Sequence, residues 1–304
     1  MIIFCLIHLW IIFFRLSVAD EYDKYFQNSI LINSTFTRKF RPNSIAVVVR
    51  AHDKYDKSLL ALIWMFESQN YPGDIFILVI PTEYESVKHL SKTLLLNWND
   101  TADKSSRKNV FVKLLHVSKS KYDENCCLLP SLCTDEWRNR MLNAHIAENS
   151  IKRFCEINSP MHYFLTDRAL DTALRICMQC VGVIITNADN FYAPTFLSTL
   201  AHLLSSFRPF TRVPGYARYD ILLTDMVNKG EAVTVETSLG MMDLGGALIC
   251  ATLLRSSNIR FLSSLPVPTE PQHYHNADFH FIEKLLAYGA RHYVEHQILF
   301  NHNR

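Results

Sequence analysis

The sequence predicts an α/β protein with a mostly parallel central sheet. Two short apolar runs rich in β-branched residues, 44–49 and 75–80, are typical of fully buried strands. Between them, a segment that begins at Asp56 repeats apolar residues at helical spacing and ends before a Pro-Gly turn. A strand–helix–strand unit of about 35 residues almost obliges its two strands to run parallel. With 304 residues, 49% of them hydrophobic, the chain can also bury a substantial core.

The later segments extend this pattern into a second, mixed half. Further strands are predicted at 109–117, 181–186, 219–225 and 231–239, and helices near 84–97 and over 135–156, 167–180, 193–207 and 277–289. Pro194 would lie in the first turn of its helix, and Gly289 would cap the last one. The first half is therefore predicted to be a parallel α/β layer and the second half mixed α+β.

The N-terminus carries an apolar leader. Its run Ile2–Phe14 covers 13 residues, fewer than the roughly 20 that span a bilayer. Small residues at 17–19 match a signal-peptidase site. We therefore expect a signal peptide at 1–19 and a polar segment at 20–43. Because no Lys or Arg precedes the apolar run, a type II membrane anchor and a cytosolic start remain open alternatives.

The sequons and the balance of charged residues limit the kinds of partner that we expect for the chain. Asn33 and Asn99 begin two sequons that would accept N-glycans on a secretory route, through the ER and Golgi lumen or to the outside of the cell. Lys and Arg number 31 against 29 Asp and Glu, and no long basic run occurs. This balance argues against a nucleic-acid partner.

The cysteines favour disulfides over zinc. Of eight cysteines, Cys5 would leave with a signal peptide, and the odd number that remains implies at least one free thiol. Five of the others form a loop group and a CxxC inside a predicted helix: Cys126, Cys127, Cys133, Cys177 and Cys180. No second CxxC and no HxxxH accompany them, so we expect one or two disulfides plus buried thiols.

A polar cluster, Asn187-Ala188-Asp189-Asn190, follows directly after the buried strand at 181–186. Open α/β sheets bind ligands at the carboxyl ends of their strands. There an Asp can bind a divalent cation that bridges nucleotide phosphates and stabilises a departing diphosphate. One Asp does not make a metal site, so further ligands must come from elsewhere in the chain. A turn that only reverses the chain is the alternative interpretation.

Five stretches occur in a recognisable order. They are the opening strand–helix–strand unit, "YFLTDRALDTAL" leading to "VIITNADN", "MMDLGGALI", "NADFHFIEKLLAYGA" and "ILFNHN". Over residues 44–302 this order resembles the nucleotide-diphospho-sugar transferases of the GT-A fold, in particular the family 2-like glycosyltransferases. The resemblance implies a GT-A-type (Rossmann-like) three-layer fold around a central, mostly parallel mixed sheet. It also implies a nucleotide-sugar-binding half at 44–190 and an acceptor-binding half at 191–304.

The resemblance assigns roles to particular residues. The family's Asp-x-Asp metal motif falls on Asn187-Ala188-Asp189, so Asp189 would bind Mn²⁺ or Mg²⁺ and Asn187 the metal or the ribose, within the donor site. His302 would complete the metal site, and Asp278, at a helix start, would be the general base. Helix stabilisation by Asp278 and an incidental position for His302 are the alternatives.

The same resemblance places further donor-binding residues at strand ends and at a helix start: Arg50, His52, Asp53, Glu83, Asp167 and Arg168. Arg168 would offer a permanently charged planar partner for phosphate. An ordinary helix cap explains Asp167 equally well. His273, His275 and His280, which surround Asp278, are interpreted as surface or acceptor-lining residues rather than a second metal site.

The implied function is transfer of a sugar from a nucleotide-diphospho-sugar, by expectation a UDP-sugar, to an acceptor hydroxyl. No Gln-x-x-Arg-Trp follows Asp278, which favours a single-transfer enzyme over a processive synthase. The acceptor, whether glycan, lipid or protein, is not specified by any motif. Asn187, where the family has Asp, favours the alternative of a non-catalytic GT-A-like binding protein. A secreted, disulfide-bearing binding domain is a third hypothesis.

Overall fold

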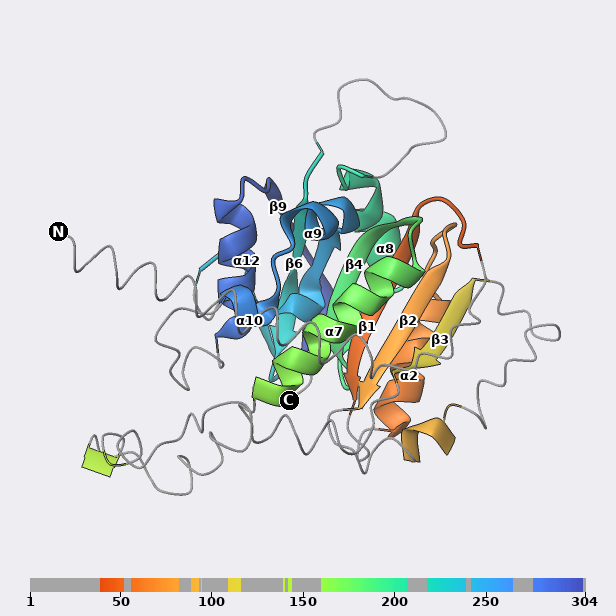
Figure 1. Cartoon of the computed structure of the whole chain (residues 1–304), viewed down its shortest axis with the longest axis horizontal. Helices are drawn as coiled ribbons and strands as arrows, with labels where there is room; N and C mark the ends of the chain where they lie inside the picture. The colour runs from red at the N-terminus through yellow and green to blue at the C-terminus, as the bar shows by residue number, and fades with distance from the viewer. Residues whose placement is uncertain are drawn as a thin grey trace, which may run out of the picture.

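The computed structural model describes residues 39–51, 56–81, 89–92, 94, 109–115, 139, 142–143, 160–206, 218–238, 242–264 and 276–302. The strands are β1 (Ser44–Ala51), β2 (Ile75–Pro81), β3 (Val110–Leu114), β4 (Cys180–Asn187), β5 (Phe191–Tyr192), β6 (Ile221–Asn228), β7 (Glu231–Val233), β8 (Ala247–Cys250) and β9 (His292–His302). The helices are α2 (Asp56–Glu67), α7 (Pro160–Ile176), α8 (Phe196–Leu200), α9 (Ala251–Ser257), α10 (Phe261–Ser264) and α12 (Ala277–Ala287), with 3-10 turns η2 (Ala201–Leu203) and η3 (Leu244–Gly246). Figure 1 shows these elements gathered around one sheet.

The described strands form one sheet in the order β3-β2-β1-β4-β8-β6-β9-β5, with β7 paired to β6. β1 is parallel to β2 and β4, β2 is parallel to β3, and β6 is parallel to β9. β8 runs antiparallel to both of its neighbours, as β5 and β7 do to theirs. The predicted parallel first half and the predicted mixed second half are therefore confirmed.

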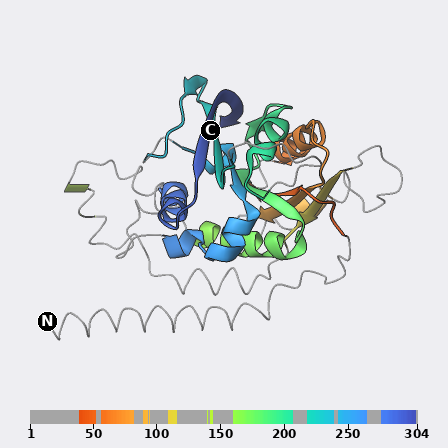
Figure 2. The ribbon, with the colours of Figure 1, turned by 90° about the horizontal axis from the view of Figure 1, so that it is seen from above.

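Helices cover both faces of the sheet. Figure 2 shows α7, α9 and α10 on one side and α2 and α8 on the other, which confirms the predicted three layers. β2 is buried along its whole length and β1 along nearly all of it, as expected for continuous Val and Ile runs covered on both faces. Each such side chain removed from water contributes about 1.5–3 kcal/mol, so the centre of the sheet is its most stable part.

The helix predicted at 167–180 is wrong at both ends. α7 begins at Pro160 and ends at Ile176. It ends there because Cys177 and Cys180 form a disulfide across the turn that leads into β4. Arg255 closes this turn from α9, donating to the carbonyl of Cys177 at 2.9 Å. It thereby satisfies a carbonyl that a helix end leaves without a partner. With the buried free thiol of Cys250, the described cysteines confirm a disulfide plus a buried thiol.

Two other predicted elements are shorter than expected. The helix predicted at 193–207 is limited to α8 and η2 and begins after Pro194, because Leu204 turns to an extended conformation and forms a bridge with Tyr219. The strand predicted at 231–239 ends at Val233, as β7. α12 forms as predicted, and Gly289 follows it with a φ of +101°, the left-handed conformation typical of a glycine cap.

Several predictions lie outside the described residues. These are the leader, both sequons, the loop cysteines and most of the helices predicted near 84–97 and over 135–156, although residues 89–92 are helical. Within the described part of the chain, every helix is too short or too polar to span a bilayer.

Candidate functional site

The carboxyl ends of β1 and β4 bring Arg50 beside the predicted metal motif. Arg50 pairs with Asn187 in the parallel ladder, and the backbone N–H of Ala188 donates to the Arg50 carbonyl at 2.9 Å. Asn187 and Asp189 are partly exposed, whereas Ala188 is buried. The cationic residue and the cluster therefore share the sheet edge at which α/β proteins bind ligands.

The cluster itself forms a well-held turn. Asn190 is buried, and its amide Nδ2 donates to the Thr186 hydroxyl at 2.9 Å. The backbone N–H of Asn190 reaches back to the Asn187 carbonyl at 3.3 Å. These bonds are local, so the turn is defined by Asn190, while Asp189 at its tip keeps partial exposure.

A buried carboxylate–imidazole pair lies at the same edge. Oδ2 of Asp243 is 2.8 Å from Nδ1 of His302, with side chains only 14% and 5% exposed respectively. Burial alone would raise the pKa of Asp243, but the hydrogen bond and charge of His302, the Gly245 N–H and the charge of Arg50 together hold it below its ordinary value. Asp243 is therefore an anion fixed between a histidine and an arginine.

Gly245 allows this pair to form. Its N–H donates to Oδ1 of Asp243 at 2.7 Å, which caps the η3 turn. A Cβ at Gly245 would lie 2.5 Å from the ring of Phe300 and 2.8 Å from Nδ2 of Asn190. The close approach joins η3 to both β9 and the turn after β4, and only glycine permits it.

The buried polar atoms at this edge that have no hydrogen-bond partner within the described structure include Arg50 Nε, Asn190 Oδ1 and Asn228 Oδ1. Asn228 is paired with His302 in the β6–β9 ladder, so all three belong to one region. Buried polar groups are normally satisfied, and a cluster that is not is typical of a site awaiting a polar ligand. The Arg50 guanidinium also lies 6.0 Å from the centre of the Tyr163 ring, within reach of a cation–π interaction.

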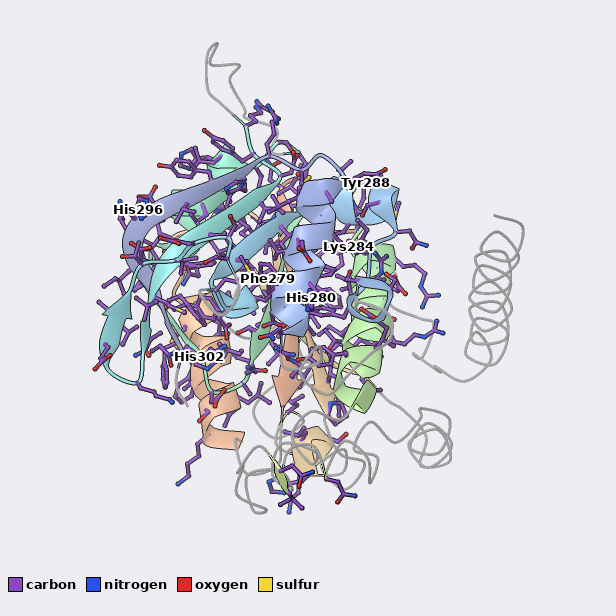
Figure 3. All side chains as sticks on the ribbon, turned by 90° about the vertical axis from the view of Figure 1, so that its left-hand side faces the viewer. Phe279, His280, Lys284, Tyr288, His296 and His302 are labelled. Carbon is purple, nitrogen blue, oxygen red and sulfur yellow. A yellow bond between two sulfur atoms is a disulfide. The ribbon has the colours of Figure 1, made fainter. Side chains whose placement is uncertain are left out.

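The next predicted site residue, Asp278, belongs to α12. It lies in the first turn of that helix, as predicted. Aromatic contacts connect the helix to Arg50, since Tyr163 packs on Phe261 at 5.5 Å and Phe261 stacks on Phe281 at 4.4 Å. Figure 3 shows the start of α12, marked by Phe279 and His280, nearer to the end that holds His302 than Tyr288 is.

Asp167 does not occupy the predicted helix start. It lies inside α7, and its carboxylate accepts the backbone N–H groups of Phe261 at 2.8 Å and Leu262 at 3.1 Å. It therefore caps α10 rather than its own helix, and both its oxygens are already engaged. Burial raises the pKa of Asp167 to about 7, against the opposing effects of these two N–H groups and Arg260. Arg168 follows it on the same helix, also away from the helix start.

The remaining predicted residues fall into two groups. His52, Asp53, Glu83, His273 and His275 lie outside the described residues. Nδ1 of His280 lies 3.3 Å from a carboxylate oxygen of Glu283, one turn further along α12. That contact is typical of a helix surface pair.

The described residues include no group of three or more His, Cys, Asp or Glu side chains that could hold a metal unaided. A cation bound together with a diphosphate needs only one or two protein ligands, because phosphate oxygens and waters complete its shell. The ladder pair Phe191 and Asn301 joins the segments that carry Asp189 and His302. This donor set fits a cation shared with phosphate.

Sequence reasoning missed Asp243 and Tyr163, and it placed Asn190 in the polar cluster without giving it a role. The stretch "MDLGG" did contain a signal, since an Asp two residues before a glycine is a good turn cap. Its partner lies 59 positions away in sequence (302 minus 243), however, and no periodicity connects the two.

No known family model and no curated protein sequence matches the chain. Among solved structures it is similar to residues 1–349 of S. aureus TarS in complex with UDP, at 12% identity and a TM-score of 0.48, covering 85% of this chain and 60% of that one. It is also similar to the mannosyltransferase PcManGT from Pyrobaculum calidifontis in complex with GDP-Man and Mn²⁺, at 13% identity, a TM-score of 0.39 and coverage of 94% and 64%. The chain thus spans less than two thirds of each of these proteins. Its function must be argued from the residues of its own site.

Proposed function

We propose that the protein is a single-transfer glycosyltransferase that moves a sugar from a nucleotide-diphospho-sugar, a UDP-sugar, to an acceptor hydroxyl. The observation that carries this proposal is the convergence of Arg50, the Asn187–Asp189 motif and the Asp243–His302 pair on one strand-end edge, next to three buried polar atoms without partners. A cation, carboxylates and unsatisfied polar groups together suit a charged, polar ligand such as a nucleoside diphosphate.

Each residue in the donor half of the site is assigned a separate role. Arg50 provides a planar, permanent positive charge for the diphosphate. Asp189 and His302 would hold Mn²⁺ or Mg²⁺, and the Asn187 amide and the backbone at Ala188 lie where a ribose or phosphate would contact the turn. When bound, such a cation neutralises negative charge that grows on the leaving diphosphate.

On the acceptor side, Asp278 is assigned the role of general base. It would accept the proton of the acceptor hydroxyl while that oxygen bonds to the anomeric carbon and the bond to the nucleoside diphosphate breaks. Its place in the first turn of α12 puts it beside the positive end of the helix dipole.

A non-catalytic protein of the same fold is the second candidate. Asn187, where the family motif has Asp, removes one negative charge from the cation site. Such a protein would bind the nucleotide or a glycan without transfer. Turnover separates the two candidates.

The first test is calorimetric titration of the purified chain with UDP, with and without Mn²⁺. We expect Mn²⁺-dependent binding that Asp189→Ala abolishes and that the matched control Asp171→Ala, an exposed acid on α7, leaves within twofold. The proposal fails if UDP and other nucleoside diphosphates do not bind under either condition, or if Asp189→Ala keeps the full affinity.

Turnover is tested by release of UDP from UDP-sugars in the presence of candidate acceptors. Asp278→Asn should keep UDP binding and lower kcat by about 10²–10⁴-fold, the usual contribution of a general base. Glu283→Gln, an exposed change on the same helix, should leave kcat unaffected. Equal activity of Asp278→Asn and the wild-type chain would remove the base from the mechanism.

A further inference from the structure

The orientation of the His302 ring is determined by its buried carboxylate partner. Its Nδ1 lies 2.8 Å from Oδ2 of Asp243 and has no other hydrogen-bond partner within the described residues, so a proton on Nδ1 is the one that the carboxylate stabilises. A metal binds only the neutral imidazole, which has lost the charge that lowers the pKa of Asp243 and keeps one protonated nitrogen. Nε2 is then left with its lone pair, the form in which histidine binds a metal.

The carboxylate has no freedom to turn away. Its other oxygen, Oδ1, accepts the Gly245 N–H at 2.7 Å. Gly245 is itself confined between Phe300 and Asn190, where a Cβ would approach to 2.5 Å and 2.8 Å. The two oxygens of Asp243 therefore have different partners: Oδ1 contacts the backbone N–H of Gly245, and Oδ2 contacts His302.

We propose that Asp243 is a positioning residue for the nucleotide site, which holds His302 in the tautomer whose Nε2 can bind the divalent cation of a nucleoside diphosphate. This inference rests on the proposed function, in which His302 is a ligand of that cation. A carboxylate behind a metal-binding histidine fixes its ring and tautomer and increases its basicity.

Asp243→Asn is the sharpest variant, because the amide oxygen can keep the bond from Gly245 while the NH₂ group replaces the oxygen that faces His302. That NH₂ group donates to Nδ1, so the proton must move to Nε2. The same exchange in serine proteases preserves the geometry and inverts the histidine tautomer. Asp225→Asn is a matched control, since Oδ1 of Asp225 accepts the Val235 N–H at 2.9 Å and Oδ2 lies 3.3 Å from Nδ1 of His296.

The experiment has two readouts on the full chain. The first is the ¹⁵N NMR spectrum of histidine-labelled protein without nucleotide, with the His302 signals assigned by their absence in His302→Gln. The second is Mn²⁺ affinity in the presence of UDP, from electron paramagnetic resonance of free Mn²⁺. We expect an Nδ1–H ring in the wild-type chain, an Nε2–H ring in Asp243→Asn, and an affinity loss of about 10–100-fold in that variant. Asp225→Asn should stay within twofold of the wild type.

The outcomes separate this inference from the proposed function. An Nε2–H ring in the wild-type chain overturns the inference even if Asp243→Asn does not fold. Equal Mn²⁺ affinity of Asp243→Asn and a wild-type chain that binds also overturns it, and leaves the nucleotide site in place. A wild-type chain that shows no Mn²⁺-dependent UDP binding instead overturns the proposed function, and with it the metal role of His302.

Discussion

Two histidines of β9 each pair with an aspartate from another segment, and the two pairs have the same arrangement of contacts. Asp225 faces His296, and Asp243 faces His302, with 3.3 Å and 2.8 Å respectively between the carboxylate and Nδ1. In each pair the other carboxylate oxygen accepts a backbone N–H. His302 ends β9, whereas His296 lies near the middle of the strand, apart from it in Figure 3.

The pairs differ in the burial of the imidazole. The His296 side chain is 66% exposed and that of His302 only 5%, although both aspartates are largely covered. Water screens the first pair, whereas the second lies in a protein interior with Arg50 nearby. The same two residue types therefore make a surface contact in one place and a buried, charged contact in the other.

The largest expected difference is in stability. Asp243→Ala leaves a buried histidine and the Gly245 N–H without their partner, which should lower the free energy of unfolding by about 3–5 kcal/mol. Asp225→Ala removes a similar pair at the surface together with one backbone bond, and should cost about 1–2 kcal/mol. Urea denaturation of both variants provides the comparison. Similar losses would show that burial does not distinguish the pairs.

Asp167 extends the comparison to a buried carboxylate without a histidine. Its pKa is raised to about 7, so as pH rises the unfolded chain loses this proton first. The stabilisation is complete below about pH 4 and is lost as pH rises through about 7.

The free-energy difference between the wild-type chain and Asp167→Asn should therefore fall by at most about 4 kcal/mol between pH 4 and pH 8. Denaturant unfolding across this range measures it. Glu231→Gln, an exposed change at the start of β7, should show no such trend. A difference that is independent of pH would contradict the raised pKa.

The smallest expected effect concerns two glycines, one packed against the buried pair and one in an open turn. Gly245→Ala places a Cβ against Phe300 and Asn190 and should cost about 1–3 kcal/mol through overpacking. Gly230→Ala, in the turn between β6 and β7, meets no atom within 4 Å but has a φ of +84°, so its cost should be about 1 kcal/mol. Thermal unfolding compares them. A larger loss at Gly230 would mean that backbone strain outweighs packing in this protein.

Local patterns predicted the sheet better than the site. The runs that form β1 and β2 are continuous and apolar, so their identity as buried parallel strands follows from composition and from the intervening helix. Asp167 shows the limit of this reasoning. An Asp at a predicted helix start suggested a cap or a donor contact, and only the packing of α7 against α10 makes it the cap of a different helix.

The sequence by itself determined the strand–helix–strand opening, the mixed second half, and the position of Asp189 after a strand and of Asp278 in the first turn of a helix. Hydrophobic periodicity and turn residues act within a few positions, and they are sufficient for such elements. Only the tertiary structure decided that Asp243 meets His302 beside Arg50. That contact depends on strand order, on ladder register and on a glycine that lets two segments approach, and no spacing along the chain encodes any of the three.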